Sequence, residues 1–349
     1  MRTFQLIKIN AATPFERGVQ YGEQAKEKIK AGIESYKRLF AQSGNRSWEQ
    51  IKEYAISFVP MIEEDMPEIL SEAKGIAEGA GVNMDELMVL NCRYEITKFP
   101  KEDECTTCAI LPEAADGGKT LLVKDWDYRA GILDNIVILH IEEPDGTRII
   151  GLTEAGQLLR EGFNSHGVGL CNNSLQSIYD SREIGIPVTF LRRKVCTCKS
   201  FEEAKNLLLT TKRGVSNNML LASKDGQAIN IEAYPKGADT IQPVDGIITH
   251  ANHFVVNPTL NALEESPRGE RLRHLLMKKH GSITIDYIKK CMSDHENYPY
   301  AICRHPSDVS LPLETRGITV ASIIIDFDEN TIHICAGPPC EGEFIQYKL

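Results

Sequence analysis

The chain has 349 residues, of which 42% are hydrophobic and 25% are charged, a composition typical of a globular protein with a large core. Its net charge of −10 leaves no basic excess to neutralise nucleic-acid phosphates or an anionic membrane surface. No segment approaches the roughly 20 consecutive apolar residues of a membrane-spanning helix, and the first residues lack the apolar block of a signal peptide. We therefore expect a cytoplasmic protein with neither nucleic-acid nor membrane partners.

The first hundred residues predict one short strand followed by helices. Phe4, Leu6 and Ile9 favour the strand. Capping boxes at residues 13–16 and 47–50 each begin a helix; the first is expected to continue to about residue 40, and the second to stop before Pro60. A third helix is predicted over residues 67–80, and a fourth from about residue 84 to residue 96.

After residue 101 the pattern changes to strands separated by turns and a few helices. The strand-like segments are residues 105–111, 119–126, 135–142, 147–153, 167–172, 217–223, 227–233, 246–250, 318–326 and 331–336. Helical patterns occupy residues 187–195, 201–210, 267–280 and 284–292. Strands and helices do not alternate strictly, so we predict an α+β protein with antiparallel sheets rather than a doubly wound parallel sheet.

The ten cysteines are expected to be thiols, because a chain of this length in a reducing compartment does not need a disulfide scaffold. Two pairs lie close in sequence, Cys105 with Cys108 and Cys196 with Cys198, but the second pair lacks the spacing of a zinc site. Residues three apart on a strand point to opposite faces, so at most one of Cys105 and Cys108 faces a site. Most of the other cysteines are interpreted as small buried apolar residues, namely Cys92, Cys171, Cys291 and Cys335.

The segment around residues 104–129 predicts a β-hairpin with candidate catalytic residues at its open end. Two apolar runs flank a loop that contains Asp116, Gly117 and Gly118. A hairpin of this length returns the end of its second strand to the start of its first, which places Cys105 and Asp127 side by side. A charged connector, residues 98–104, precedes the hairpin, and connectors of this kind are where chains are cut.

Cleavage between Glu104 and Cys105 would give Cys105 both a thiol and a free α-amino group. An α-amine has a pKa of about 7.7–8.0, so it can accept the thiol proton without help from a histidine. Acyl transfer by such a nucleophile also needs hydrogen-bond donors for the oxyanion.

A set of motifs in this order resembles the acyl-coenzyme A:6-aminopenicillanate acyltransferase (isopenicillin N acyltransferase) family of N-terminal nucleophile hydrolases, over nearly the whole chain. The motifs are Gly75-Ile-Ala-Glu-Gly-Ala80, Leu90-Asn-Cys-Arg93-Tyr-Glu95, Cys105-Thr-Thr107, Trp126-Asp127, Gly162-Phe-Asn164, Thr249-His-Ala-Asn252-His-Phe and Gly337-Pro-Pro-Cys340. The resemblance implies an αββα sandwich formed by a precursor that cleaves itself. Residues 1–104 would become a small, mainly helical subunit, and residues 105–349 a large catalytic subunit that stays associated with it as a heterodimer.

The resemblance also implies the site residues. Cys105 is the nucleophile, and Asp127 positions its amine or thiol. Lys124 matches a position where relatives that act on bile acids have an arginine. Asn252 and Asn173 match contributors to the oxyanion hole, and Arg268 matches an arginine that supports the site.

The chain departs from the fungal member of the family at two positions. Glu104 stands where that enzyme has glycine before its cysteine, and Asp125 stands where it has asparagine. Asp125 would add a negative charge near the amine unless it points away or pairs with Lys124 or Arg129. The resemblance therefore does not imply penicillin as a substrate.

Three functions are open at this point. The first is a self-processing cysteine amidohydrolase or acyltransferase acting on an acyl amide or acyl thioester. The second is a conventional thiol hydrolase in which His250 or His253 activates Cys105 in an intact chain. The third is a non-catalytic, uncleaved binding relative. We expect no cofactor, because no glycine loop that would hold phosphates is present, and no metal, because the His250–His253 pair lacks metalloprotease spacing. A homo-oligomer is left open.

Overall fold

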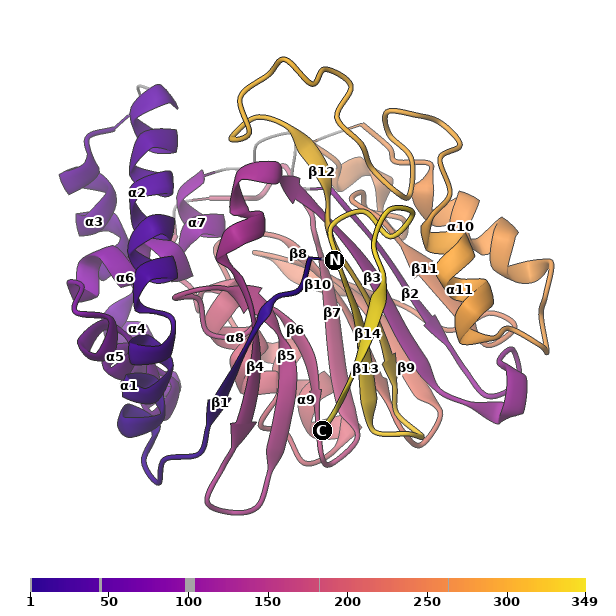
Figure 1. The fold of residues 1–349 in the computed structure, drawn as a ribbon, viewed down its shortest axis with the longest axis horizontal. Coiled ribbons are helices and arrows are strands. Elements are labelled where there is room, and N and C mark those ends of the chain that lie inside the picture. The colour runs from indigo at the N-terminus through magenta and orange to yellow at the C-terminus, as the bar shows by residue number, and fades with distance from the viewer. Residues whose placement is uncertain (1, 44–45, 98–103, 182, 263) are drawn as a thin grey trace.

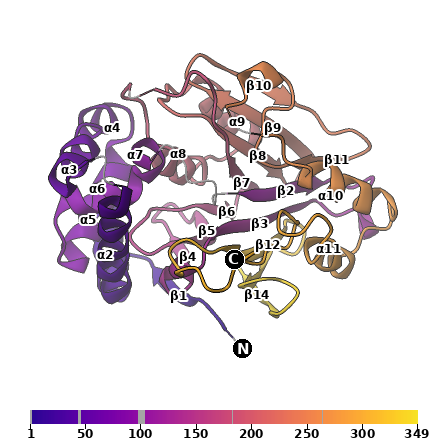
Figure 2. The same ribbon diagram turned by 90° about the horizontal axis from the view of Figure 1, so that it is seen from above.

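A computed structural model describes residues 2–43, 46–97, 104–181, 183–262 and 264–349. Two sheets lie face to face between two helical layers (Figure 1). The N-terminal helices cover one side, and the helices that follow residue 267 cover the other (Figure 2). This arrangement confirms the predicted αββα sandwich.

The first layer is built mainly by the N-terminal part of the chain. Its helices are α1 (Pro14–Gln24), α2 (Lys26–Ser43), α3 (Trp48–Ile56), α4 (Val59–Asp65), α5 (Pro67–Ala80), α6 (Met84–Asn91) and α7 (Arg93–Thr97), joined by α8 (Val188–Val195) and α9 (Phe201–Thr210). Both predicted capping boxes form, at Thr13 and at Ser47. Gly81 ends α5 in the left-handed conformation, with φ of 63°, which glycine adopts without steric cost.

The sheet beneath these helices has eight strands in the order β1-β4-β5-β6-β7-β8-β9-β10. The strands are β1 (Gln5–Ile9), β4 (Ile136–Glu142), β5 (Arg148–Glu154), β6 (Glu161–Asn164), β7 (Val168–Ser174), β8 (Asn217–Ser223), β9 (Gln227–Tyr234) and β10 (Gly237–Ile241). The pairing of β1 with β4 is parallel, and it places the N-terminal strand at the edge of this sheet.

The second sheet has six strands in the order β11-β2-β3-β12-β13-β14. They are β2 (Cys105–Ile110), β3 (Leu121–Arg129), β11 (Ile247–His250), β12 (Gly317–Asp326), β13 (Thr331–Ala336) and β14 (Phe344–Lys348). Helices α10 (Arg268–Met277) and α11 (Ile285–Met292) cover its outer face. The predicted hairpin is therefore at the centre of the sheet as β2 and β3.

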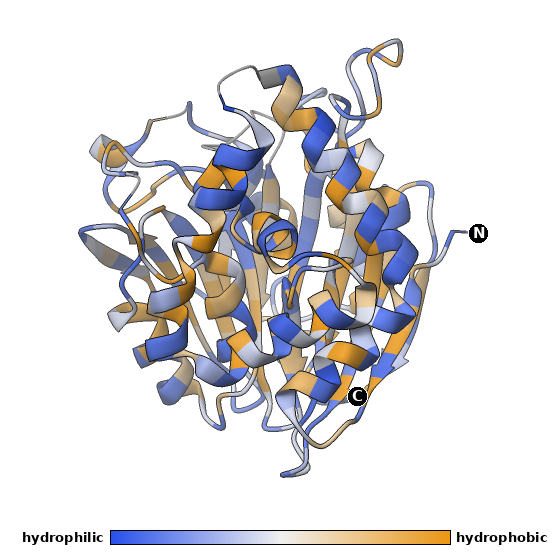
Figure 3. Cartoon of the chain, turned by 90° about the vertical axis from the view of Figure 1, so that its left-hand side faces the viewer, coloured by the Kyte–Doolittle hydropathy of each residue, from blue (hydrophilic) through white to orange (hydrophobic). Residues whose placement is uncertain are grey.

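Alternation of side chains along the strands produces the layers. In the second sheet Ala109 and Leu122 pack inward against the first sheet, whereas Cys108 and Val123 pack outward against α10 and α11. The helices of the first layer bury their apolar stripes on the eight-stranded sheet, and Figure 3 shows hydrophilic and hydrophobic residues side by side along those helices.

The structure corrects several predicted elements. The first predicted helix is two helices, because α1 ends and α2 begins on either side of Ala25. The segment from residue 84 to residue 96 is likewise divided at Cys92. The second predicted helix, α3, ends before Pro60 as expected, but a further helix, α4, follows at once with Pro60 in its first turn, where its missing N–H costs no hydrogen bond. Strands β6, β10 and β14 were not predicted, and each has only four or five residues.

Within the described residues, no helix is both long and apolar enough to cross a membrane. The predicted connector is described only at Glu104, since residues 98–103 lie outside the described part of the chain.

Candidate active site

The hairpin brings Cys105 next to the end of β3, as the sequence predicts. Cys105 pairs with Trp126 across the two strands, so both side chains lie on the inner face of the sheet. Asp127 is one residue further along β3, and its backbone N–H donates to the carbonyl oxygen of Glu104 at 2.9 Å. The side chain of Cys108 lies on the opposite face, which confirms that only Cys105 of this pair faces the interior between the sheets.

The peptide bond between Glu104 and Cys105 is held on both sides. The Glu104 carbonyl accepts the hydrogen bond from Asp127, and the Cys105 N–H donates to Oδ1 of Asn252 at 2.7 Å. Attack on the Glu104 carbonyl carbon would place negative charge on an oxygen that already has a backbone donor. Donors fixed in this way lower the energy of an oxyanion.

Asn252 follows β11 and Arg268 begins α10. Their side chains contact each other and residues at the start of β2. Oδ1 of Asn252 also accepts from Nη2 of Arg268 at 2.7 Å, and its Nδ2 donates to the Ser174 carbonyl at 2.9 Å. Arg268 is buried and donates from Nε to Oγ1 of Thr106 at 3.2 Å. Arg268 is thus buried against β2 and does not lie on a solvent-exposed face of α10.

The side chain of Glu104 is bound by two arginines. Its carboxylate pairs with the guanidinium of Arg268, and Oε2 lies 3.1 Å from Nη1 of Arg304. The contact with Arg268 is a charge-assisted hydrogen bond, which is stronger than a neutral one, and Arg304 adds an ion pair. They fix the residue immediately before Cys105, at the position where the family resemblance would have suggested glycine.

Asp127 has one bound and one unbound carboxylate oxygen. Oδ1 accepts from Oγ1 of Thr319 at 2.7 Å, whereas Oδ2 is buried and has no hydrogen-bond partner among the described residues. Burial raises the pKa of Asp127 to about 7, and the positive charges of Arg268 and Arg304 oppose this rise only in part. The carboxyl group can therefore gain or lose a proton near neutral pH.

Burial disfavours the extra negative charge that the sequence position of Asp125 suggested. It lies opposite Thr106 on β2 and Ser322 on β12, and it is fully buried. Burial, and next the charge of Asp127, raise the pKa of Asp125 well above its ordinary value. A protonated Asp125 has the same charge as an asparagine.

Asn173 on β7 connects the two sheets beside the candidate nucleophile. Its Nδ2 donates to Oγ1 of Thr107 at 3.1 Å and to the Ala251 carbonyl at 2.7 Å. Thr107 is two residues after Cys105 on the same face of β2, and Ala251 precedes Asn252. The structure therefore places both predicted asparagines around the start of β2.

The two histidines considered as bases have other partners. Nδ1 of His250 lies 2.7 Å from the Ala251 carbonyl, and Nε2 lies 2.8 Å from Oε1 of Glu232. Nδ1 of His253 accepts from the backbone N–H of Ser266 at 3.2 Å. Burial lowers the pKa of His253, and the neighbouring His250 lowers it further.

Lys124 lies on the inner face of β3, opposite Thr107. It is buried and pairs with the carboxylate of Glu161, which is also 3.2 Å from Nε of Arg160. The guanidinium of Arg160 stacks on the ring of Trp126, 4.1 Å from its centroid. Lys124 thus belongs to a buried charged cluster between the sheets. The pair that it forms with Thr107 is the second along the hairpin from the pair of Cys105 and Trp126.

Two residues of the site were not identified from the sequence. They are Arg304, which contacts Glu104, and Thr319, which connects Arg304 to Asp127. The Thr319 N–H donates to the Arg304 carbonyl at 3.0 Å, and its Oγ1 donates to Asp127. Arg304 comes from a loop with no motif of its own. Thr319 had one usable signal, since it lies in the strand predicted over residues 318–326, and that strand pairs with β3.

Comparison with known proteins identifies the family. Residues 114–341 match the sequence model of the family described as acyl-coenzyme A:6-aminopenicillanic acid acyl-transferase. The chain is also 27% identical over 325 residues to the acyl-coenzyme A:6-aminopenicillanic-acid-acyltransferase 40 kDa form of Emericella nidulans, covering 90% of this chain and 87% of that protein. The family predicted from the motifs is thereby confirmed.

The solved structures that match the chain are more distant in sequence. A mutant of conjugated bile acid hydrolase from Clostridium perfringens matches with a TM-score of 0.49 and 13% identity, covering 70% of this chain and 97% of that one. An N-acylethanolamine-hydrolyzing acid amidase ortholog from Caenorhabditis elegans matches with a TM-score of 0.48 and 14% identity, covering 64% and 93%. On the sequence match over most of its length, the chain belongs to the acyl-coenzyme A:6-aminopenicillanic acid acyl-transferase family and is an enzyme of the acyl-transfer class.

Proposed function

We propose that this protein is a self-processing N-terminal cysteine amidohydrolase or acyltransferase, which cuts its own chain between Glu104 and Cys105 and then uses Cys105 as its nucleophile. The observation that carries the proposal is the fixation of the Glu104–Cys105 peptide bond, by the Asp127 N–H on one side and Asn252 Oδ1 on the other.

Maturation begins when Sγ of Cys105 attacks the carbonyl carbon of Glu104. The new S–C bond forms, the C–N bond to Cys105 breaks, and the thiol proton passes to the leaving nitrogen. Asp127 holds the Glu104 carbonyl through its backbone N–H during this step, and burial raises the pKa of its carboxyl group to about 7. Water then hydrolyses the thioester to give a new C-terminal carboxylate at Glu104 and a free Cys105 thiol. Residues 1–104 and 105–349 are then the two subunits.

In turnover the new α-amine of Cys105 accepts the thiol proton, and the thiolate attacks an acyl amide or acyl thioester. The amide of Asn252, with a backbone N–H near Asn173, holds the oxyanion, and Arg268 positions Asn252. An acyl-enzyme forms and the amine or thiol leaves. Water gives hydrolysis, and an amine acceptor gives transfer. We favour hydrolysis, because water is always present whereas transfer needs an acceptor pocket.

The alternative of a Cys–His thiol hydrolase receives less support. Both ring nitrogens of His250 are within 2.8 Å of oxygen partners, and Nδ1 of His253 accepts a backbone hydrogen bond. Either imidazole would have to change partners before it took a proton from Cys105, whereas the α-amine belongs to the nucleophile itself.

Intact-mass measurement of the purified protein tests the proposal. The wild-type chain should give two species that meet at 104/105 and co-elute, Cys105→Ala should remain one inactive chain, and Cys105→Ser should be cut slowly. Cys108→Ala is the matched control, since Cys108 lies on the same strand but on the outer face, and it should be cut normally. An intact chain that is active, or an active Cys105→Ala variant, contradicts the proposal.

The substrate class can be found with the processed protein. Acyl amides, β-lactams and acyl amino acids are incubated separately, and the liberated amine is measured against Cys105→Ala. An amine released only by the wild type identifies the acyl donor, and release that persists in Cys105→Ala excludes Cys105 as the nucleophile for that substrate.

A further inference from the structure

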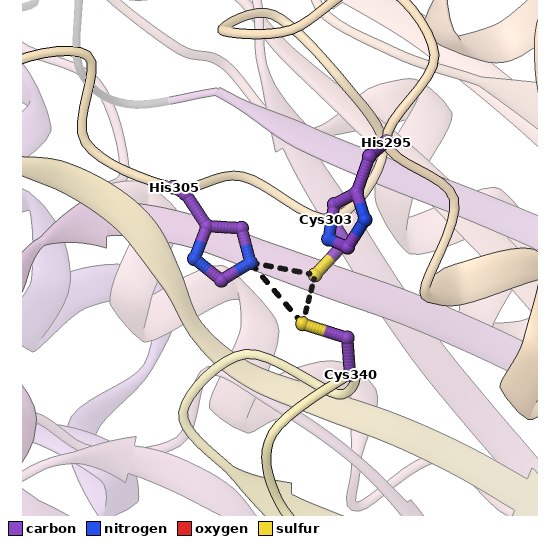
Figure 4. A group of neighbouring side chains, drawn as sticks. All are labelled: His295, Cys303, His305 and Cys340. Atoms are coloured by element: carbon purple, nitrogen blue, oxygen red, sulfur yellow. Dashed lines mark hydrogen bonds between the residues drawn. The ribbon is translucent and has the colours of Figure 1, made fainter.

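Two histidines and two cysteines meet outside the candidate active site (Figure 4). Three of them lie in the long loop between α11 and β12, and the fourth lies in the Gly337-Pro-Pro-Cys340 turn after β13, a motif to which the proposed reaction gives no role. The ligand atoms of the four side chains are all within 4.8 Å of one another; the residues are His295, Cys303, His305 and Cys340.

The distances fit a tetrahedral ion. Zinc–sulfur bonds of about 2.3 Å and zinc–nitrogen bonds of about 2.0–2.1 Å give tetrahedral edges of about 3.8 Å between sulfurs and about 3.6 Å between sulfur and nitrogen. The two sulfurs, of Cys303 and Cys340, are 3.6 Å apart. Nε2 of His305 is 3.6 Å from the Cys303 sulfur and 3.1 Å from the Cys340 sulfur. The ring of His295 lies beside that of His305, with centroids 5.1 Å apart.

We propose that these four side chains bind one zinc ion, as a site of the Cys₂His₂ type. Thiolate and imidazole ligands in a tetrahedral set select zinc, and four protein ligands leave no open position for substrate, so the ion is structural rather than catalytic. Binding displaces the thiol protons of Cys303 and Cys340, since the thiolate is the ligand. Sequence spacing did not reveal this site, because Cys340 is far from the other three residues along the chain.

A bound ion would hold in a fixed position the loop that supports the candidate active site. Cys303 and His305 flank Arg304, whose guanidinium contacts Glu104. The Arg304 N–H donates to Oγ1 of Thr319 at 2.8 Å, and the same hydroxyl donates to Asp127. A zinc ion bound by residues of this loop and of the turn after β13 would therefore fix the backbone on both sides of Arg304.

The inference does not depend on the proposed self-cleavage, so it is tested on the wild type and on Cys105→Ala. Each full-length protein is purified under reducing conditions from a zinc-supplemented culture, without a metal-affinity tag, and dialysed against metal-free buffer. Zinc is measured by mass spectrometry, and free thiols are counted in parallel. The site variants are Cys340→Ser and His295→Ala, because both side chains are exposed and neither change disturbs the core. His274→Ala, an exposed histidine on α10, is the matched control.

We expect about one zinc ion per chain in the wild type, Cys105→Ala and His274→Ala proteins. Cys340→Ser and His295→Ala should lower zinc affinity by more than about tenfold. Cobalt added to the metal-free protein should give the visible absorption of a tetrahedral thiolate site, and this absorption should weaken in Cys340→Ser. The proposal is overturned by a wild type that keeps all its thiols but binds no zinc, by a Cys303–Cys340 disulfide in place of the metal, or by zinc that both site variants retain.

Discussion

Oδ1 of Asn252 accepts the backbone N–H of Cys105 at 2.7 Å, although 147 positions separate the two residues in sequence. The same oxygen accepts from Arg268, and the Nδ2 group donates to the Ser174 carbonyl. Asn252 therefore offers an acceptor to the uncut chain and an amide donor to the matured site, and these two roles can be separated by substitution.

Asn252→Asp keeps the acceptor and loses the donor, whereas Asn252→Ala loses both. We expect Asn252→Asp to process itself but to lose about 10²–10³-fold in kcat, the usual effect of removing one oxyanion donor. Asn252→Ala should be impaired in both steps. Processing is followed by intact mass, and kcat is measured per processed molecule. Equal kcat in the wild type and Asn252→Asp would show that the amide does not stabilise the oxyanion.

Glu104 should matter for maturation and not for turnover. Its carboxylate is bound by Arg268 and Arg304, and this binding fixes the peptide bond that is cut. Glu104→Gln removes the charge from both ion pairs, so we expect processing to slow by about tenfold, corresponding to about 1.4 kcal/mol in the barrier. After cleavage Glu104 belongs to the other subunit, and kcat per processed molecule should be unchanged.

Glu113→Gln is the control for this prediction, because Glu113 is exposed in the loop of the same hairpin. It should process at the wild-type rate. Two outcomes would refute the role given to Glu104: a Glu104→Gln chain that matures as fast as this control, or one whose kcat falls as far as its processing rate.

The sequence predicted the neighbours of Cys105 that follow from strand pairing and missed those that arrive from loops. Hairpin length and turn residues were enough to bring the end of β3 to the start of β2, where Cys105 pairs with Trp126 and Asp127 follows, since pairing register is a local property. Asn252, Asn173 and Arg268 came from the resemblance to a family, because no spacing rule connects β7, β11 and α10 to β2. Arg304 had neither signal.

The proposed zinc cluster shows the same limit. His295, Cys303 and Cys340 are brought together by the packing of a loop against a turn, and tertiary packing of this kind leaves no periodicity in the sequence. The short strands β6, β10 and β14 were not predicted, although β1 and β11 are equally short and were.

The raised pKa of Asp127 predicts how stability changes with pH in the uncut chain. Below its ordinary pKa of 3.8 the carboxyl group is protonated whether the chain is folded or unfolded, so its ionisation does not change the free energy of unfolding. As the pH rises toward about 7 only the unfolded chain ionises freely, so Asp127 progressively lowers the free energy of unfolding. Above about pH 7 the carboxyl group ionises in the folded chain as well, and the free energy of unfolding falls no further through Asp127.

The test compares Cys105→Ala with Cys105→Ala/Asp127→Asn by urea unfolding at several pH values. Asparagine cannot ionise, so the double variant should gain relative stability between about pH 4 and pH 7, by at most about 1.4 kcal/mol per pH unit, and then level off. Cys105→Ala/Asp225→Asn, with its change in an exposed turn, should show no such trend. A stability difference that is constant across this range would mean that Asp127 ionises normally in the folded chain.

A buried ion pair joins the two predicted subunits, and its loss should be costly. Glu72 on α5 and Arg193 on α8 form two hydrogen bonds, of 3.0 and 2.8 Å, and both side chains are buried. Glu72→Ala leaves the guanidinium with Glu143 as its remaining acidic partner, so we expect a loss of about 3 kcal/mol, the lower end for breaking a buried pair. Glu63→Ala removes an exposed pair with Lys74 in the same helical layer and should cost at most about 1 kcal/mol.

Urea unfolding of both changes in the Cys105→Ala background measures the difference directly. In the processed protein, the Glu72→Ala subunits should also separate at a lower urea concentration than those of Glu63→Ala, because α5 and α8 then belong to different chains. The parallel pairing of β1 with β4 remains in both variants and should keep the subunits together without denaturant. If Glu72→Ala and Glu63→Ala cost the same, the buried pair does not hold the two segments together, and the apolar contacts between the helices and the sheet must do so alone.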